Sequence, residues 1–252
     1  GGRGDKTHSL VLNRATDSTR SPGSSFKLLT VYSPALDTAG MTLATVYDDV
    51  PYLYSTGKLV TNVDDEYHGL MTIREAITVS RNVPAVKIIT DLSPELGYSY
   101  ALSYGISTLT PEEQHYQAIA LGGITNGATN YEMTAAYAAI ANYGVYNEPK
   151  LYSKVLDHDG NILLDNTASS SHRVIKESTA WLLDSALRSV VTDNITYLMS
   201  DNMYYAGKSG TSQLNTDKWF IGFSPYYTAG IWIGNDDSTP VNTGYYTMTH
   251  LN

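Results

Sequence analysis

The chain has 252 residues, no cysteine and a formal net charge of −9 at pH 7. That length can bury the core of one large domain or two modest ones, and the lack of cysteine excludes a disulfide scaffold, a thiol nucleophile and a thiolate metal site. The acidic balance argues against a nucleic-acid partner, because binding phosphates requires a basic face.

The first elements predicted along the chain are a strand and a helix. The stretch "HSLVLNRA" over residues 8–15 has the composition of a short strand. After a break at Pro22-Gly23, residues 24–37 have helical spacing, and Pro34 is expected to end or kink that helix. Residues 37–66 are rich in Tyr, Thr and Asp with little periodicity, which predicts loops and short strands.

The middle of the chain is predicted to be helical. Three capping boxes, in which a threonine precedes a glutamate by three residues, begin at Thr72, Thr110 and Thr129. Pro84 suits the first turn of the helix that follows the first box. The third box opens an Ala-rich helix that Gly144 is expected to stop.

The last part of the chain changes character. Residues 151–166 alternate around an Asp-Gly pair, which predicts a hairpin, and residues 176–191 form an amphipathic helix pattern. Three strand-like runs follow at 204–214, 218–225 and 227–236, joined by short turns. Helices in the middle and an antiparallel meander at the end predict helices packed on an antiparallel sheet.

Ser24 and Lys27 lie at the start of the first predicted helix, where residues three apart share a face. Serine is a poor nucleophile without a base in hydrogen-bond reach. A lysine can be that base if burial and nearby positive charge depress its pKa, and the N–H groups of a helix start can stabilise an oxyanion. The pair alone is a common pattern, so it needs further motifs to define a site.

Two further motifs follow in order. Ser80-Arg81-Asn82 comes directly after the first capped helix, and "KSGT" at 208–211 lies on the first of the terminal strands. The order S-x-x-K, S-x-N, K-[ST]-G is the signature of penicillin-binding proteins and class A β-lactamases. Each motif falls on the local structure that its role requires, namely a helix start, a loop between helices and a strand.

On these motifs the chain resembles the transpeptidase domain of class A (bifunctional) penicillin-binding proteins, in the superfamily of penicillin-recognising serine transferases and hydrolases. Longer stretches carry the same resemblance over nearly the whole length: "NRATDSTRSPGSSFK", "TIREAITVSRNVPAVK", "NYEMTAAYAAIANYGVYNEP" and "AGKSGTSQLNTDKWFIGFSP". The resemblance implies an α/β (α+β) domain, with a central antiparallel sheet of about five strands, helices on both faces and an all-helical subregion.

The resemblance also implies a D,D-transpeptidase that cross-links peptidoglycan stem peptides and is a target of β-lactam antibiotics. In it, Ser24 attacks the carbonyl between two terminal D-alanines and Lys27 takes the serine proton. Ser80 relays a proton to the leaving amine with the help of Lys208. Asn82 binds the substrate amide and supports Lys27. An amine of a second stem peptide then attacks the acyl-enzyme, and no metal or cofactor is required.

Substrate binding is implied for the rest of the third motif. Backbone N–H groups of Ser24 and Thr211 hold the oxyanion, and the hydroxyls of Ser209 and Thr211 bind the terminal carboxylate, with Gly210 between them. Taken one at a time, each of these residues also fits a purely structural role. Lys208 suits a surface strand, Asn82 a helix cap, and Thr211 any strand position.

One domain is expected over residues 1–252, as a fragment of a longer chain. The first residues, "GGRGDKTHSL", carry no initiator Met and no signal-peptide core, and no apolar run approaches the ~20 residues that cross a bilayer. The resemblance places a glycosyltransferase domain and a membrane anchor upstream. The parent protein is then expected at the extracytoplasmic face of the bacterial cell membrane, with the membrane contacted only through a segment outside this chain.

The sequence departs from the family pattern in three places. Leu28 stands where relatives often have proline, and the segment after "VVT" at 190–192 lacks an expected Gly-Thr pair. The chain also stops at Asn252 without an obvious final helix to cover the sheet.

Three other functions remain open from the sequence. A class A β-lactamase needs a deacylating glutamate, and Glu95 in "SPELGYS" lies only 15 residues after Ser80, too close for the family placement. A β-lactam-sensing receptor domain would share the motifs without being an enzyme. A D,D-carboxypeptidase would use water as the acceptor.

Three short patterns are set aside. An "RGD" at 3–5 is a weak match, and "DHDGN" at 157–161 lacks the acid that a calcium loop needs at its twelfth position, where Ala168 stands. The six histidines form no H-E-x-x-H motif.

Overall fold

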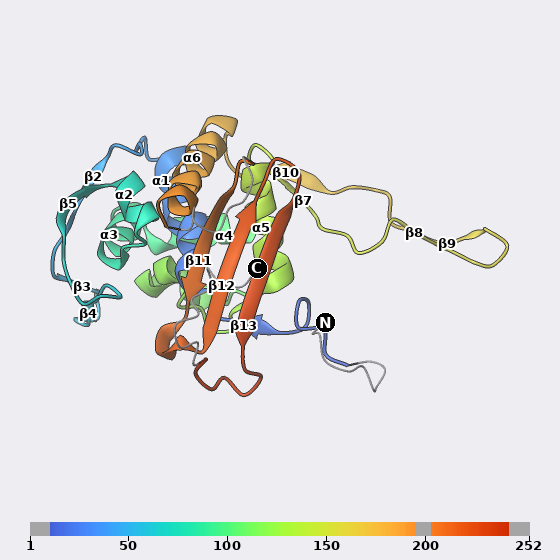
Figure 1. Ribbon diagram of the computed structural model, residues 1–252, viewed down its shortest axis with the longest axis horizontal. Coiled ribbons are helices and arrows are strands. Elements are labelled where there is room, and N and C mark those ends of the chain that lie inside the picture. The colour runs from blue at the N-terminus through green and yellow to red at the C-terminus, as the bar shows by residue number, and fades with distance from the viewer. Residues whose placement is uncertain (1–10, 195–202, 242–252) are drawn as a thin grey trace.

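The computed structural model describes residues 11–194 and 203–241. Its central feature is an antiparallel sheet in the order β11-β12-β13, formed by Ala206–Thr211, Asp217–Phe223 and Thr228–Gly234. Two helices, α5 (Asn130–Ala141) and α6 (Glu177–Asn194), pack against this sheet (Figure 1). The predicted combination of helices with an antiparallel terminal meander is therefore present.

Side chains alternate in burial along the middle strand β12. Asp217, Trp219, Ile221 and Phe223 are buried, and the residues between them are partly exposed. The buried face is the one against which α5 and α6 pack. The opposite face, turned toward the viewer in Figure 1, carries no helix within the described residues. Within the same residues this sheet has three strands, where about five were expected.

The helix that carries Ser24 changes its pitch twice. It starts as a 3₁₀ turn, η1 (Gly23–Phe26), continues as a π-helix, η2 (Leu28–Tyr32), and ends as α1 (Ser33–Asp37). Pro34 lies in the first turn of α1 and lacks the N–H that would bond back to the preceding π-helical turn. The helix nevertheless continues beyond Pro34 to Asp37, and its pitch changes just before the proline.

A helical region lies beside the sheet. Its elements are α2 (Ile73–Thr78), α3 (Asn82–Leu92), α4 (Pro94–Ser103), η3 (Pro111–His115) and η4 (Gln117–Leu121). All three predicted capping boxes are present, at the starts of α2, η3 and α5. The second box opens a 3₁₀-helix. The predicted stop of α5 is also confirmed, because the helix ends at Ala141 before Gly144.

Short two-stranded pairs connect these parts. They are β1 (Thr19–Arg20) with β6 (Ala128–Thr129), β2 (Val46–Asp49) with β5 (Gly69–Thr72), β3 (Tyr52–Leu53) with β4 (Leu59–Val60), β7 (Val145–Asn147) with β10 (Ser171–Arg173), and β8 (Lys154–Leu156) with β9 (Ile162–Asp165). The pairs β2–β5 and β3–β4 confirm the prediction of short strands in the Tyr- and Asp-rich region.

The strand predicted at 8–15 is wrong within its described part. Residues 14–17 form a turn, in which the side chain of Asn13 accepts a hydrogen bond from the Ala15 N–H at 3.1 Å. An Asx turn of this kind interrupts an extended run even when apolar residues precede it.

The predicted hairpin forms at β8 and β9 and projects from the body of the molecule (Figure 1). At its tip, Asp157 Oδ1 accepts hydrogen bonds from the N–H groups of Asp159 and Asn161, at 2.9 and 2.8 Å. The "DHDGN" pattern therefore builds a turn.

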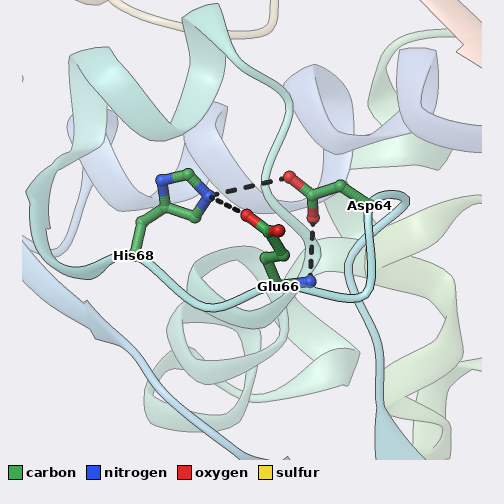
Figure 2. A group of neighbouring side chains, drawn as sticks. All are labelled: Asp64, Glu66 and His68. Atoms are coloured by element: carbon green, nitrogen blue, oxygen red, sulfur yellow. Dashed lines mark hydrogen bonds and ion pairs between the residues drawn. The ribbon is translucent and has the colours of Figure 1, made fainter.

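The connection between β4 and β5 lies at the edge of the helical region. It carries Asp64, Glu66 and His68, whose side chains come together at the surface (Figure 2). They form the one His/Asp/Glu group with metal-ligand spacing in the described ranges, and all three are exposed. Because exposed acidic groups are common without a metal, the group does not define a metal centre.

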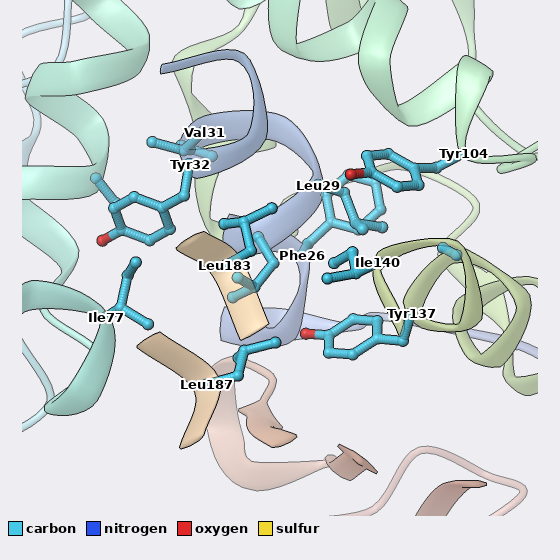
Figure 3. Close-up of a cluster of buried hydrophobic side chains, with 14 of the residues drawn as sticks. Phe26, Leu29, Val31, Tyr32, Ile77, Tyr104, Tyr137, Ile140, Leu183 and Leu187 are labelled. Atoms are coloured by element: carbon cyan, nitrogen blue, oxygen red, sulfur yellow. The ribbon is translucent and has the colours of Figure 1, made fainter. Parts of the chain in front are cut away.

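The hydrophobic core surrounds the helix that carries Ser24. Phe26, Leu29 and Tyr32 of this helix are fully buried. Figure 3 shows them among side chains of several helices: Ile77 of α2, Tyr104 after α4, Tyr137 and Ile140 of α5, and Leu183 and Leu187 of α6. The nucleophile candidate therefore stands at one end of a segment that is buried in the core.

None of the helices in the described ranges combines the length and the apolarity that a membrane crossing requires.

Candidate active site

The start of η1 lies directly against strand β11. Gly23 adopts a positive φ of 53°, and a Cβ there would overlap the backbone of Thr211. A Cβ on Gly210 would likewise overlap the carbonyl oxygen of Pro22. Glycine at both positions is what permits this approach, since any side chain would push the helix start and the strand apart. Ser24 is thereby brought beside the third motif.

Two buried side chains hold the backbone on either side of Ser24. The Tyr137 hydroxyl of α5 donates to the carbonyl oxygen of Ser25 at 2.7 Å. The indole N–H of Trp219, in β12, donates to the carbonyl oxygen of Ser21 at 2.8 Å. The bond from Tyr137 is buried, and the bond from Trp219 is partly buried because Ser21 is partly exposed. They fix the position of the start of η1 relative to α5 and β12.

Lys27 is completely buried and points at the second motif. Its Nζ donates to the carbonyl oxygens of Ser80 at 2.7 Å and Arg81 at 3.1 Å, and to Oδ1 of Asn82 at 2.7 Å. Burial, together with the nearby positive charges of Lys208 and Arg81, lowers the pKa of Lys27 well below its usual value. This shift favours the free amine more than in an exposed lysine.

Ser80 stands between two lysines. Its Oγ accepts a hydrogen bond from Lys208 Nζ at 2.9 Å and lies 3.4 Å from Lys27 Nζ. The backbone of Ser80 has a φ of 60°, which is uncommon for a residue with a side chain. Such strain persists only where the surrounding structure enforces it, and it is typical of functional sites.

Asn82 is the first residue of α3, and its side chain does not cap that helix. Oδ1 accepts from Lys27, and Nδ2 donates to the carbonyl oxygen of Thr61 at 2.8 Å. The amide is thus oriented by partners from two other segments. The contact with Lys27 is the one that the family resemblance implies.

Lys208 is 1% exposed, so it is not a surface strand residue. Besides the bond to Ser80, its Nζ donates to the carbonyl oxygen of Ser209 at 3.2 Å. Burial lowers the pKa of Lys208 to about 8. Lys27, Ser80, Asn82 and Lys208, called the two-lysine cluster below, therefore form one bonded group drawn from three motifs.

The remaining predicted residues lie outside that bonded group. Within the described residues the Ser24 hydroxyl has no hydrogen-bond partner, and it is partly exposed. Ser24 and Lys27 are joined instead through the backbone, since the Lys27 N–H donates to the Ser24 carbonyl oxygen. Ser209 and Thr211 are exposed and alternate with the buried Lys208 and Gly210 along β11.

A buried carboxylate braces the turn that follows Thr211. Asp217 is 5% exposed and accepts from the hydroxyls of Ser212 at 3.0 Å and Thr216 at 2.8 Å. Its other oxygen accepts from the indole N–H of Trp232 at 3.0 Å. No motif or periodicity in the sequence marks Asp217 as a site residue. Its position beside "KSGT" is the one available signal.

Two shallow hollows, of about 520 and 510 Å³, lie elsewhere. The first is at the base of the projecting hairpin around Lys150 and Tyr152, and the second surrounds Trp181 near the start of α6. Neither hollow is lined by a residue of the three motifs. The candidate site is therefore identified by the hydrogen bonds and burial of its residues.

Comparison with known proteins identifies the family. The family model described as penicillin binding protein transpeptidase domain matches residues 3–236. Penicillin-binding protein 1A of Clostridium tetani (strain Massachusetts / E88) is 38% identical over 95% of this chain and 32% of its own length. Penicillin-binding protein 1F of Bacillus subtilis (strain 168) is 33% identical over 89% of this chain and 31% of its own. The chain thus spans about a third of these relatives.

Solved structures share the fold. The PonA1 protein from Mycobacterium tuberculosis in complex with penicillin V superimposes with a TM-score of 0.81 at 24% identity, over 93% of this chain and 65% of that one. Penicillin-binding protein 1A from Haemophilus influenzae gives a TM-score of 0.77 at 25% identity, over 90% and 39%. The predicted α/β fold class is confirmed, and the chain belongs to the family of penicillin-binding protein transpeptidase domains.

Proposed function

We propose that this chain is a serine D,D-transpeptidase domain that cross-links peptidoglycan stem peptides and is acylated by β-lactams. The observation that carries the proposal is the two-lysine cluster, in which Lys27 and Lys208 both reach Ser80 beside the helix of Ser24. Burying two lysines around one serine hydroxyl carries a desolvation cost, and ionisable groups with such perturbed pKa values cluster at functional sites. Membership of the transpeptidase family supports the same reading.

Acylation begins with Ser24. Its Oγ forms a bond to the carbonyl carbon of the penultimate D-alanine, and its proton passes to the free amine of Lys27. The C–N bond to the last D-alanine then breaks, and the leaving amine takes a proton through Ser80. Lys27 and Lys208 both lie within hydrogen-bond reach of the Ser80 hydroxyl, so either can restore that proton.

Substrate binding falls to the edge of β11. The backbone N–H groups of Ser24 and Thr211 form the oxyanion hole, because the glycine contacts bring η1 and β11 together. Gly210 has no side chain and so lets the strand lie against the helix start. The exposed hydroxyls of Ser209 and Thr211 bind the substrate carboxylate. The charge of Lys208, one residue earlier on the strand, attracts that carboxylate.

The second half of the reaction uses an amine of a neighbouring stem peptide. That amine attacks the ester carbonyl and gives up a proton to the free amine of Lys27. A new amide bond forms as the ester bond to Ser24 breaks, and Lys27 passes the proton on to Ser24. A β-lactam resembles the D-Ala-D-Ala end and opens on Ser24 in the same way. Relatives with the same fold include the M. tuberculosis penicillin-binding protein A, solved as an imipenem acyl-enzyme complex.

Residues 1–252 form one transpeptidase domain of a longer protein in this proposal. The relatives are about three times as long as the match. A glycosyltransferase domain and a membrane anchor belong to the remainder, and the parent protein works on the extracytoplasmic face of the cell membrane.

Glu95 gives no support to the β-lactamase alternative. It is exposed in the first turn of α4, and Leu96 beside it donates its N–H to the Ser93 hydroxyl as part of that helix start. Persistent acylation is therefore expected, whereas rapid turnover of nitrocefin would favour the hydrolase.

The test is the intact mass of the chain after incubation with benzylpenicillin. The wild-type chain should gain the mass of one penicilloyl group on Ser24, and Ser24→Ala should gain none while keeping its circular dichroism spectrum. Ser25→Ala, one residue along, is the matched control and should still be labelled. Absence of any adduct on the folded wild-type chain would remove the proposed function.

A further inference from the structure

An asparagine that belongs to no motif, Asn62, bonds to the backbone of the second motif. Asn62, in the connection from β4 to β5, is 4% exposed. Its Oδ1 accepts from the backbone N–H of Asn82 at 2.8 Å and from that of Val83 at 3.4 Å. These N–H groups open α3, and no side chain at the N-cap position satisfies them. Asn62 therefore caps α3 from a separate segment.

The other end of the Asn62 amide is fixed as firmly. Its Nδ2 donates to Oδ1 of Asp49 at 2.8 Å and to the carbonyl oxygen of Glu66 at 2.9 Å. Asp49, the last residue of β2, is completely buried. With both ends bonded, the amide has one orientation, which directs its oxygen at Asn82.

Asp49 also holds Arg81, the middle residue of the second motif. Arg81 Nε lies 3.1 Å from Asp49 Oδ2, and the Arg81 side chain is 7% exposed. On the outer side, Arg81 Nη1 donates to both carboxylate oxygens of Asp64, at 2.7 and 2.6 Å. Asp64 belongs to the surface group of Figure 2, so that group is the outer end of this network.

These contacts converge on Lys27. The carbonyl oxygens of Ser80 and Arg81 and the amide oxygen of Asn82 accept hydrogen bonds from its Nζ. All three acceptors lie on residues 80–82, a segment whose first residue has strained backbone. A strained segment stays in place only if its neighbours hold it. Asn62 accepts a hydrogen bond from the N–H of its last residue, and Asp49 forms an ion pair with its middle residue.

We propose that Asn62 is a positioning residue, which with Asp49 and Arg81 sets residues 80–82 at the distance from Lys27 that acylation requires. The inference rests on the proposed function. Asn62 keeps the Asn82 backbone in place while the Asn82 side chain exchanges its bond to Thr61 for the substrate amide. Substrate can then bind without loosening the acceptors that surround Lys27.

The first variant is Asn62→Ala, compared with Gln117→Ala. Gln117 is a matched control, since it is also a buried amide that accepts from a backbone N–H, that of Ser55 at 2.8 Å, and also donates to Thr90 Oγ1. Stopped-flow labelling with a fluorescent penicillin gives the acylation rate constant, the dissociation constant before acylation, and the fraction labelled. A loss of folded protein lowers the fraction, whereas mispositioning lowers the rate constant of the part that is labelled.

Asn62→Ala should lower the acylation rate constant about tenfold to a hundredfold, with the dissociation constant changed less. Gln117→Ala should stay within about threefold of wild type. Asp49→Asn is the second variant, in case Asn62→Ala does not fold. It keeps the size of the side chain, removes the charge that holds Arg81, and should slow acylation about threefold to tenfold.

A double-mutant cycle tests the route through Asn82. If Asn62 acts through that residue, adding Asn62→Ala to Asn82→Ala should slow acylation less than it does in the wild-type background. Additive changes in the cycle would instead assign the effect of Asn62 to the carbonyl oxygens of Ser80 and Arg81, which also surround Lys27. The inference is overturned if a folded Asn62→Ala or Asp49→Asn chain is acylated as fast as Gln117→Ala. A wild-type chain that is never labelled would instead refute the proposed function.

Discussion

The two sides of the candidate site differ in how far they are assembled without substrate. On the inner side, Lys27 and Lys208 are buried, and both reach the hydroxyl of Ser80. On the outer side, Ser24 is partly exposed, Ser209 and Thr211 are exposed, and the Ser24 hydroxyl is unbonded within the described residues. The groups that move protons are thus in place beforehand, and the groups that touch substrate are left accessible to it.

This difference follows from the physical demands on each side. A lysine acts as a base near neutral pH only if burial and nearby charge lower its pKa, so the inner side must exclude water. Substrate must reach the serine and the strand edge, so the outer side must remain open. Substitutions on the two sides should therefore change different kinetic constants.

The largest effect beyond loss of Ser24 is expected at Lys27. Lys27→Ala removes the base and should lower the acylation rate constant by about 10²- to 10⁴-fold. Lys87→Ala is the matched control, because Lys87 is a partly buried lysine on α3 that donates to the Asp48 carbonyl oxygen. Acylation measured by intact mass against time checks both variants. Wild-type labelling of Lys27→Ala would remove Lys27 as the base.

The pH dependence of acylation should report both lysines. Acylation should rise with pH as Lys27 loses its proton, since the free amine is the base. It should fall again above about pH 8, the pKa of the buried Lys208, because loss of that proton removes the charge that attracts the substrate carboxylate.

Lys208→Ala sharpens this test. The alkaline limb of the profile should disappear, and the acid limb should move to higher pH, because the charge of Lys208 helps to lower the pKa of Lys27. Rates of penicillin labelling between pH 5 and 10 check both changes, with Lys87→Ala as the control that keeps both limbs. An alkaline limb that survives in Lys208→Ala would assign it to another group.

The smallest effect is expected on the outer side. Ser209→Ala removes one hydroxyl that binds the substrate carboxylate, and it should raise the dissociation constant before acylation about three- to tenfold. The acylation rate constant should change little, since Ser209 is exposed and not part of the two-lysine cluster. Stopped-flow labelling separates the two constants. A fall in the rate constant alone would place Ser209 on the proton-handling side.

Much of this arrangement was predictable from local sequence. The three capping boxes depend on residues three apart, and the terminal meander depends on strand alternation, so each is encoded in a short stretch. Each of the three motifs is also a short stretch of sequence, so the residues of the two-lysine cluster could be located in the same way. The alternation of side chains along a strand also predicts that Lys208 lies on the opposite face of β11 from Ser209 and Thr211.

Other features depend on contacts between distant segments. Asn62 and Asp49 lie in a region without periodicity, and their importance comes from Asn82 and Arg81, which are 20 and 32 residues further along. The change from 3₁₀ to π geometry at Lys27 lies just after the point where the helix start meets β11. The sequence pattern of 24–37 alone predicts only a helix.

The protonation state of Lys27 is the central claim, and it can be measured directly. An NMR titration of the chain with isotopically labelled lysine side chains, with the Lys27 signal assigned by its absence in Lys27→Ala, gives its pKa. The account predicts a value well below the ordinary 10.5, with Lys208 titrating near 8. A Lys27 that keeps its proton up to the ordinary value would contradict the account.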